Sequence, residues 1–254
     1  MSRPTPDLPD EAAQRNGPAP RFDDEPLAKA ICATRRLIDL LGASDAPDEV
    51  LEREALVLEE IADRIEATAE PGKRMRMPPD PSAHPQGFFP SSPMSGWANP
   101  LALPISIWAV DEVDGPVVRG RAIFPLTYEG PPTCVHGGMI ALLFDEILGT
   151  ANLVAGRPGM TGTLSVRYRR PTPLLIPLEL EARQIRVDGR KIITEATISV
   201  DGEVTASAEA IFIEVPPAQM LGIIGGNAER AGDAVIDKTM RQVLEDRAAA
   251  GESY

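Results

Sequence analysis

The chain has little of what several kinds of site require. Among its 254 residues only Cys32 and Cys134 are cysteines, and they lie far apart in the sequence. This spacing gives neither a disulfide framework nor a set of zinc ligands. We therefore expect a reduced, cytoplasmic protein that holds no metal ion or other cofactor.

Basic charge is also scarce, since 25 Lys and Arg oppose 38 Asp and Glu and the formal net charge is −13. This balance argues against broad nucleic-acid binding, which needs a basic face. No apolar run reaches the roughly 18 to 20 residues of a membrane-spanning helix, and the acidic, Pro-rich N-terminus shows no secretory signal. The sequence predicts a soluble protein without a membrane span.

The N-terminal part of the chain predicts two segments outside the main domain. Residues 1–24 are rich in proline and show little hydrophobic pattern, which is typical of a disordered tail. Residues 25–70 contain two stretches with helical spacing of apolar side chains, one closed by Gly42 and the other ended at Pro71. Together they predict a helical hairpin that caps the domain or forms an interface, or alternatively acts as a regulatory arm.

Two further segments flank the main domain. Residues 71–100 are rich in proline and predict an extended connector. Phe88, Phe89 and Trp97 are expected to pin it to the domain or, alternatively, to line a tunnel for an acyl chain. Residues 216–254 predict a C-terminal tail with a helix.

The rest of the chain is organised around the stretch from Cys134 to Gly149. Gly137 and Gly138 open it, and an apolar run without proline follows. The run from Met139 to Val154 is too long for a strand, so it predicts a buried helix with Asp145 in its middle. A helix that begins with glycines presents free backbone N–H groups, which suit an anion or a developing oxyanion.

Asp145 is the residue in this helix that most needs an explanation. It shares a helical stripe with small and apolar residues, where a carboxylate is costly to desolvate unless it has partners or a task. The alternative is that Asp145 and Glu146 form an exposed acidic pair at the edge of the helix.

The domain over residues 101–215 combines this helix with strands. Two β-like runs precede the helix and four follow it, with Asp-Gly pairs at the turns. The runs are Ile105–Val113, Pro116–Phe124, Met160–Arg170, Leu178–Val187, Lys191–Val200 and Val204–Val215. An apolar helix among antiparallel strands hides its surface only if the sheet curls around it, which predicts an α+β domain.

Three motifs in this domain carry a resemblance to a known family. They are His136-Gly137-Gly138 with Asp145 nine residues after the histidine, Gly159-Met160-Thr161 through Tyr168-Arg169-Arg170-Pro171, and Gly189-Arg190-Lys191. With them the chain resembles the hotdog-fold acyl-CoA thioesterases, closest to the phenylacetate-pathway thioesterase-like group and human thioesterase superfamily members four and five. The resemblance covers about residues 101–215. It implies an antiparallel sheet wrapped around one long central helix, an acyl-CoA substrate, and a homodimer or a tetramer built as a dimer of dimers.

The resemblance also implies roles for individual residues. Asp145 corresponds to the general base or nucleophile, and the Gly137 amide to the group that polarises the thioester carbonyl. Thr161 corresponds to a residue that holds the attacking water, and His136 to one that orients the loop. Substrate contacts are implied for Gly138, Gly162, Thr163, Arg169, Arg170, Arg190 and Lys191.

Each of these residues also has a structural interpretation. Thr161 would then be a solvated strand residue and His136 a loop cap. The four basic residues would be solvated turn charges, although guanidinium groups also bind phosphates such as those of coenzyme A. The residues before the HGG motif, Glu129 to Thr133, offer no Asn or Gln for a second polar contact to the substrate.

Two functions from different classes remain open. The first is hydrolysis of a fatty or aromatic acyl-CoA, for which one carboxylate, one water and one oxyanion donor suffice, because a thiol of pKa about 8.5 leaves readily as a thiolate. The second is a non-catalytic acyl-CoA-binding or regulatory hotdog protein. The presence of Asp145 on an apolar stripe favours the enzyme.

The spacing of Gly137 and Asp145 predicts that two chains share each site. Eight residues of helix separate them by about 12 Å at 1.5 Å per residue. Both cannot act on one carbon at that distance. Two antiparallel copies of the helix, related by a two-fold axis, would bring Gly137 of one chain near Asp145 of the other.

Overall fold

The computed structural model describes residues 26–68 and 90–216, together with a few residues between 218 and 249. The predicted tail over 1–24, the connector up to Phe89 and most of the C-terminal tail lie outside these described residues. The first described elements are the predicted helices α2 (Pro26–Gly42) and α3 (Asp48–Glu66).

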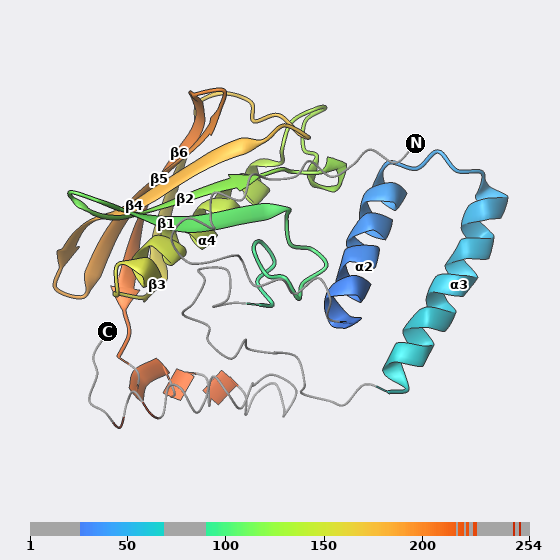
Figure 1. The fold of residues 1–254 in the computed structure, drawn as a ribbon, viewed down its shortest axis with the longest axis horizontal. Coiled ribbons are helices and arrows are strands. Elements are labelled where there is room, and N and C mark those ends of the chain that lie inside the picture. Colours follow the sequence, from blue (N-terminus) through green and yellow to red (C-terminus); the bar gives the residue numbers. More distant parts are fainter. Residues whose placement is uncertain are drawn as a thin grey trace.

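The main domain contains one antiparallel sheet around one long helix (Figure 1). The six strands stand in the order β1-β2-β4-β5-β6-β3, and each neighbouring pair is antiparallel. Its elements are β1 (Ile105–Glu112), β2 (Gly115–Ala122), η4 (Leu126–Tyr128), α4 (Gly137–Val154), β3 (Gly159–Tyr168), β4 (Leu178–Asp188), β5 (Lys191–Val200) and β6 (Glu203–Glu214). The predicted α+β hotdog architecture is confirmed, and β3 stands at one edge of the sheet.

The core helix α4 explains why the sheet curls. Eight of its 18 residues are buried against the sheet, among them Leu143, Phe144 and Leu148, which have no exposed surface. By length and composition α4 is long enough to cross a membrane, so the expectation that no apolar run has this length is wrong. In this structure its buried side chains belong to the protein core instead.

The tight turns between strands form where Asp-Gly pairs predict them. Gly189 between β4 and β5 has φ 57°, and Gly202 between β5 and β6 has φ 78°. Glycine takes this left-handed conformation without steric cost, which is why two-residue hairpins favour it.

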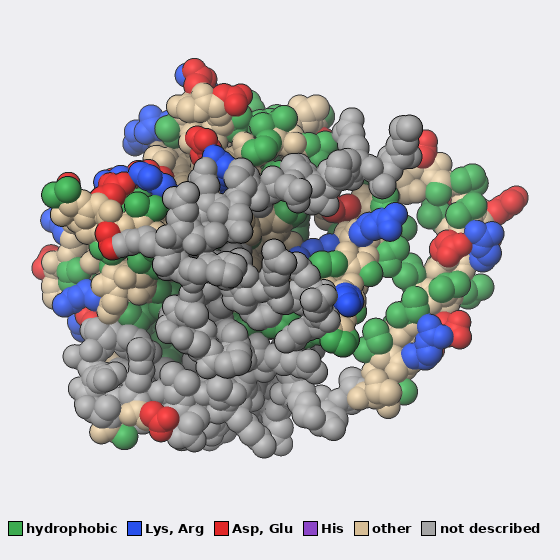
Figure 2. Space-filling view, viewed as in Figure 1, with side chains coloured by type: hydrophobic (Ala, Val, Ile, Leu, Met, Phe, Trp, Pro, Cys, Tyr) green, Lys and Arg blue, Asp and Glu red, His purple; other side chains and the backbone are tan. Residues whose placement is uncertain are grey.

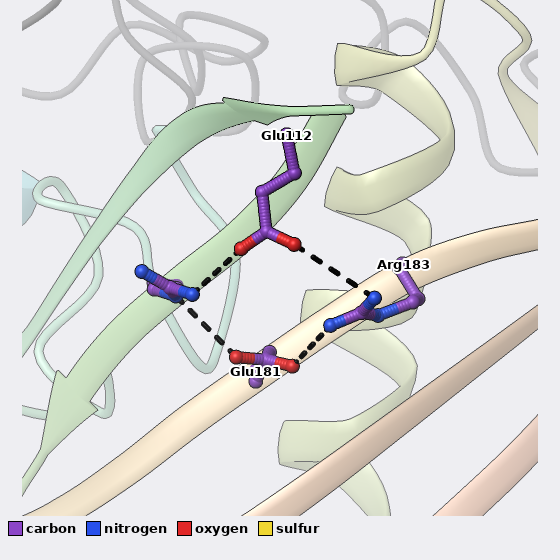
Figure 3. A network of polar contacts seen from close by, with 4 residues as sticks. Glu112, Glu181 and Arg183 are labelled. Carbon is purple, nitrogen blue, oxygen red and sulfur yellow. Dashed lines mark hydrogen bonds and ion pairs between the residues drawn. The ribbon is translucent and has the colours of Figure 1, made fainter. Parts of the chain in front are cut away.

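The outer face of the sheet carries a network of charged side chains (Figure 3). Arg119 on β2 contacts Glu112 at 2.7 Å and Glu181 at 3.3 Å, and Arg183 on β4 contacts Glu181 at 2.6 Å. All four side chains are partly exposed, and such ion pairs typically contribute about 1 kcal/mol or less each. The network supports the pairing of β1, β2 and β4, but the apolar core holds the sheet together.

The two N-terminal helices differ in how they meet the domain. Arg35 on α2 donates hydrogen bonds to main-chain carbonyls of the loop before β1, and Ala28 is buried. None of the residues of α3 is buried, and α3 stands apart from α2 (Figures 1 and 2). Within the described part of the chain only α2 therefore packs on the main domain, and the role of the hairpin as a cap, an interface or a regulatory arm stays a prediction. Large apolar side chains stay exposed on both helices: Leu37, Leu40, Leu41, Leu56, Val57, Ile61 and Ile65.

The segment from Pro90 to Pro104, called the 90–104 loop below, is compact and not extended as predicted. Consecutive turns fill it, and Met94 is fully buried in the core cluster. The packed domain therefore begins before residue 101.

Candidate functional site

The N-terminus of α4 leaves one backbone N–H unpaired. His136 is the N-cap residue, and its Nδ1 accepts a hydrogen bond from the Gly138 N–H at 3.0 Å. The next N–H groups, of Met139 and Ile140, donate to the His136 carbonyl. Among the described residues the Gly137 N–H has no hydrogen-bond partner in the structure. It is thus the first-turn donor available to an anion or an oxyanion.

Gly138 is required by the cap itself. A Cβ at this position would lie 3.2 Å from Nδ1 and 3.3 Å from Cε1 of His136, so a side chain would press on the capping ring. His136 is therefore a cap in this structure, as its structural interpretation has it. A cap can also orient the loop, which is the role that the family resemblance implies for His136.

This contact leads to a stability prediction. Gly138→Ala should displace the His136 ring, and the lost N-cap, at a usual cost of about 1 kcal/mol, should offset the stabilisation that alanine otherwise brings to a helix. Gly149→Ala in the same helix is the control, because its Cβ would meet Phe212 at an ordinary 3.8 Å. Replacing a mid-helix glycine by alanine typically stabilises by about 1 kcal/mol, so urea unfolding should show a gain in stability for Gly149→Ala and none for Gly138→Ala.

Asp145 is held by a hydroxyl group on the neighbouring strand. The Thr161 Oγ1 donates a hydrogen bond to Asp145 Oδ1 at 2.7 Å. Thr161 comes directly before a bulge in β3, where Thr161 pairs with Phe212 and Thr163 with Ile211. Gly162 is the extra residue, and a Cβ there would lie 3.2 Å from the Ile211 carbonyl oxygen. The bulge thus explains Gly162 structurally and sets the direction of the Thr161 side chain.

Glu146 does not lie at an exposed edge beside Asp145. The Ser95 hydroxyl donates a hydrogen bond to Glu146 Oε1. Burial raises the pKa of Glu146, the hydroxyls of two serines act to lower it, and the charge of Asp145 acts to raise it. The alternative of an exposed acidic pair is therefore wrong for Glu146. The sequence carried no signal for Ser92 and Ser95, which sit in a loop among prolines.

The raised pKa of Glu146 predicts a pH-dependent stability difference. Its ionised form opposes folding at neutral pH, and this effect disappears once the pH falls below the ordinary value of 4.5. Glu146→Gln keeps an acceptor for Ser95 without the charge, so it should be more stable than wild type at pH 8 and equal to it below pH 4.5. Urea unfolding at several pH values measures this, with exposed Glu179→Gln as the control. A constant difference across the pH range would contradict it.

Tyr168 at the end of β3 contacts the start of α4. Its hydroxyl donates to the Gly137 carbonyl at 2.8 Å, and its ring would lie 3.5 Å from a Cβ at Gly137. Glu129, in the loop before the HGG motif, accepts a hydrogen bond from the Thr133 N–H at 2.7 Å. This glutamate therefore supports a turn and does not replace the missing Asn or Gln.

The predicted basic residues lie at opposite ends of β3. Arg169 and Arg170 follow Tyr168, where Arg169 Nε donates to Ser207 Oγ and Arg170 forms an ion pair with Glu203. Arg190 lies near the other end, where its Nε and Nη2 donate to the Glu214 carbonyl at 3.1 and 2.9 Å. Lys191 beside it is exposed. Phosphate binding by these residues stays a prediction, and one chain does not bring the two pairs together.

One chain therefore contains two half-sites. Thr161 meets Asp145 in the middle of α4, whereas Tyr168 and His136 meet Gly137 and Gly138 at its start. About 12 Å of helix separates Gly137 from Asp145. Within the described ranges, no group of His, Cys, Asp and Glu side chains is arranged to hold a metal ion.

Comparisons with known proteins identify the domain. A sequence model described as "Thioesterase superfamily" matches residues 133–207. The acyl-coenzyme A thioesterase THEM4 of Mus musculus is 35% identical over 98 residues, which are 38% of this chain and 42% of that protein. The THEM4 protein of Xenopus laevis is 33% identical over 91 residues, 35% of this chain and 41% of that protein. The chain thus matches less than half the length of these curated relatives.

A solved structure gives a match over more of the chain. It is the crystal structure of a thioesterase superfamily protein with 40% sequence identity and a TM-score of 0.66. The match covers 75% of this chain and 92% of the other, so it extends beyond residues 133–207. On its sequence, its fold and the arrangement of the residues around α4, the chain belongs to the thioesterase superfamily.

Proposed function

We propose that the protein is an acyl-CoA thioesterase that hydrolyses a fatty or aromatic acyl-CoA to the free acid and coenzyme A. The observation that carries the proposal is the contact of Asp145 Oδ1 with the Thr161 hydroxyl at 2.7 Å, beside the edge strand β3. The names of the curated relatives, which are acyl-coenzyme A thioesterases, support the same reaction.

In this proposal Asp145 acts as a general base on water. The carboxylate takes a proton from a water molecule that Thr161 helps to hold, and the resulting hydroxide attacks the thioester carbonyl carbon. The carbonyl oxygen becomes an oxyanion and accepts a hydrogen bond from the Gly137 N–H. The C–S bond then breaks and coenzyme A leaves as a thiolate, which needs little protonation since a thiol has a pKa of about 8.5. Direct attack by Asp145 as a nucleophile is the variant of this mechanism that the geometry leaves open.

The proposal includes a homodimer whose sites are shared. Ten of the 18 residues of α4 are not buried in one chain, although the helix is apolar along most of its length. The neighbouring β3 has a free edge, where a second copy of β3 can extend the sheet. Two α4 helices packed antiparallel at that edge would join the half-site of Asp145 and Thr161 to the partner's half-site at Gly137. A tetramer built from two such dimers and a cytoplasmic location stay predictions.

The second candidate is an acyl-CoA-binding or regulatory protein without turnover. It has the same fold and needs an acyl-CoA pocket, but it has no use for a carboxylate held by Thr161. Asp145 therefore favours the enzyme.

A hydrolysis screen tests the proposed function. Purified full-length protein is mixed with a panel of short-chain, long-chain and aromatic acyl-CoAs, and free thiol is measured. We expect multiple turnovers with at least one acyl class. Binding of acyl-CoA in calorimetry without release of thiol for any substrate would contradict the enzyme and support the binding protein.

A further inference from the structure

Among the described residues, two side chains of α2, one helical turn apart, form hydrogen bonds with the main domain. Arg35 lies on the 90–104 loop, and Asp39 Oδ1 accepts a hydrogen bond from Thr127 Oγ1 at 3.0 Å. From each side chain a short series of contacts leads to α4, the first to the turn that carries Asp145 and the second to the cap at His136.

The first series begins with the Arg35 guanidinium. Its Nη2 donates to the carbonyl oxygens of Asn99 at 2.6 Å and Gly96 at 3.0 Å, and its Nε also donates to Asn99 at 3.2 Å. A planar guanidinium that binds neighbouring carbonyls fixes their relative direction. Arg35 therefore holds the 90–104 loop in one orientation relative to α2.

The loop itself is tightly packed, so it can transmit this constraint. The Gly96 N–H donates to the Ser92 carbonyl at 3.1 Å and the Ala98 N–H to the Pro90 carbonyl at 2.9 Å. A Cβ at Gly96 would lie only 2.3 Å from the Pro90 carbonyl oxygen, which shows how closely the turns approach one another.

The loop reaches α4 at the residue next to Asp145. The Ser95 hydroxyl donates to the Glu146 carboxyl, and the Ser92 Oγ accepts the N–H groups of Met94 at 3.1 Å and Ser95 at 3.3 Å. A buried carboxyl is costly without such donors. The contact therefore ties this turn of α4 to the 90–104 loop, one residue away from Asp145.

The second series begins at Asp39 and reaches the other half-site. Thr127 and Tyr128 belong to η4, and the Tyr128 carbonyl accepts the His136 N–H at 2.9 Å. The Tyr128 hydroxyl donates to the Leu101 carbonyl, which ties η4 to the 90–104 loop. Asp39 thus acts on the cap that precedes Gly137.

We infer that α2 is a positioning element of the active site. Arg35 acts through Ser95 and Glu146 on Asp145, and Asp39 acts through η4 on the His136 cap beside Gly137. Neither residue touches the reacting atoms. The effect on turnover rests on the proposed function, whereas the link between α2 and α4 does not. A helix outside the residues 133–207 that match the family would then set the geometry of both half-sites.

Variants of the full-length protein test this inference. Arg35→Met and Asp39→Leu should each lower kcat at least about tenfold with KM changed less than about twofold, because a displacement of about 1 Å in a catalytic group can cost about 100-fold. Arg36→Met on the exposed side of α2 is the control, and Asp39→Asn, which keeps a carbonyl acceptor, should retain wild-type kcat. Hydrogen exchange should accelerate around Asp145 in Arg35→Met and near residue 137 in Asp39→Leu.

A purely stabilising role gives a different result. Lower melting temperatures with unchanged kcat and unchanged exchange in α4 would overturn the inference. If Arg35→Met does not fold, Ser95→Ala interrupts the same series from its other end and should give the same loss of kcat. The kcat of the Arg35→Met/Ser95→Ala double variant should equal that of the less active single variant, because both substitutions interrupt the same series of contacts. Fully additive losses of kcat would contradict the inference. If the wild type hydrolyses no acyl-CoA, the proposed function fails, and the exchange measurement alone decides on the link.

Discussion

Asp145→Asn is expected to lower kcat at least about 100-fold while KM stays close to that of the wild type. A general base usually contributes about 10²- to 10⁴-fold to turnover, and the amide keeps the size of the side chain without its basicity. Thr161 can still donate to the amide oxygen, so the hydrogen bond seen at 2.7 Å has a replacement and the fold should be unaffected. Steady-state kinetics with the best acyl-CoA from the screen measures the effect.

The control for this variant is an aspartate far from the site. Asp114→Asn makes the same chemical change in the exposed turn between β1 and β2, at the edge of the sheet opposite β3, and should keep wild-type kcat. Retention of more than about a tenth of the wild-type kcat by Asp145→Asn would contradict the role of Asp145 as the base.

Gly137→Pro should also abolish most of the turnover, by about 10²- to 10³-fold, which is the usual effect of removing one oxyanion donor. Proline is well tolerated at the first position of a helix, and Gly137 is that position. The preceding His136 has φ −60° and ψ 130°, the conformation that a residue before proline prefers. The substitution therefore removes the unpaired N–H with little expected change in the fold.

Gly137→Ala separates the N–H from the shape of the residue. It keeps the donor, and its Cβ would meet the Tyr168 ring at an ordinary 3.5 Å. We expect it to keep most of the wild-type kcat. Equal losses in the alanine and proline variants would show that space at this position matters, and not the N–H group.

The elements that repeat a local pattern could be predicted from the sequence. The apolar run from Met139 to Val154, the alternating strands and the Asp-Gly turns each follow from residues close together in the chain, and the structure has them within about two residues of the predicted bounds. The family resemblance implied that Thr161 and Asp145 act in one site, but it did not predict the hydrogen bond between them, because no local pattern links two residues on different elements.

What the sequence did not predict depends on contacts between distant segments. Glu146 looked like a solvated neighbour of Asp145, because the serines that bury it lie some 50 residues earlier in a Pro-rich loop. The contacts of Arg35 could not be predicted either, because its carbonyl partners lie more than 60 residues away. Helical periodicity indicates which face of a helix is apolar but not which segment it meets, so it does not distinguish α2, which packs on the domain, from α3, which has no buried residue.

A complementation experiment with mixed dimers tests the central claim most directly, namely that Asp145 of one chain and Gly137 of another act on the same thioester. Asp145→Asn and Gly137→Pro proteins, each inactive alone, are mixed under conditions that allow subunit exchange, and mixed dimers are isolated by two different affinity tags. In such a dimer one of the two sites keeps both native groups, so we predict about half the wild-type activity per dimer. No recovery in verified mixed dimers, or a fully active monomer in light scattering, would contradict the shared site.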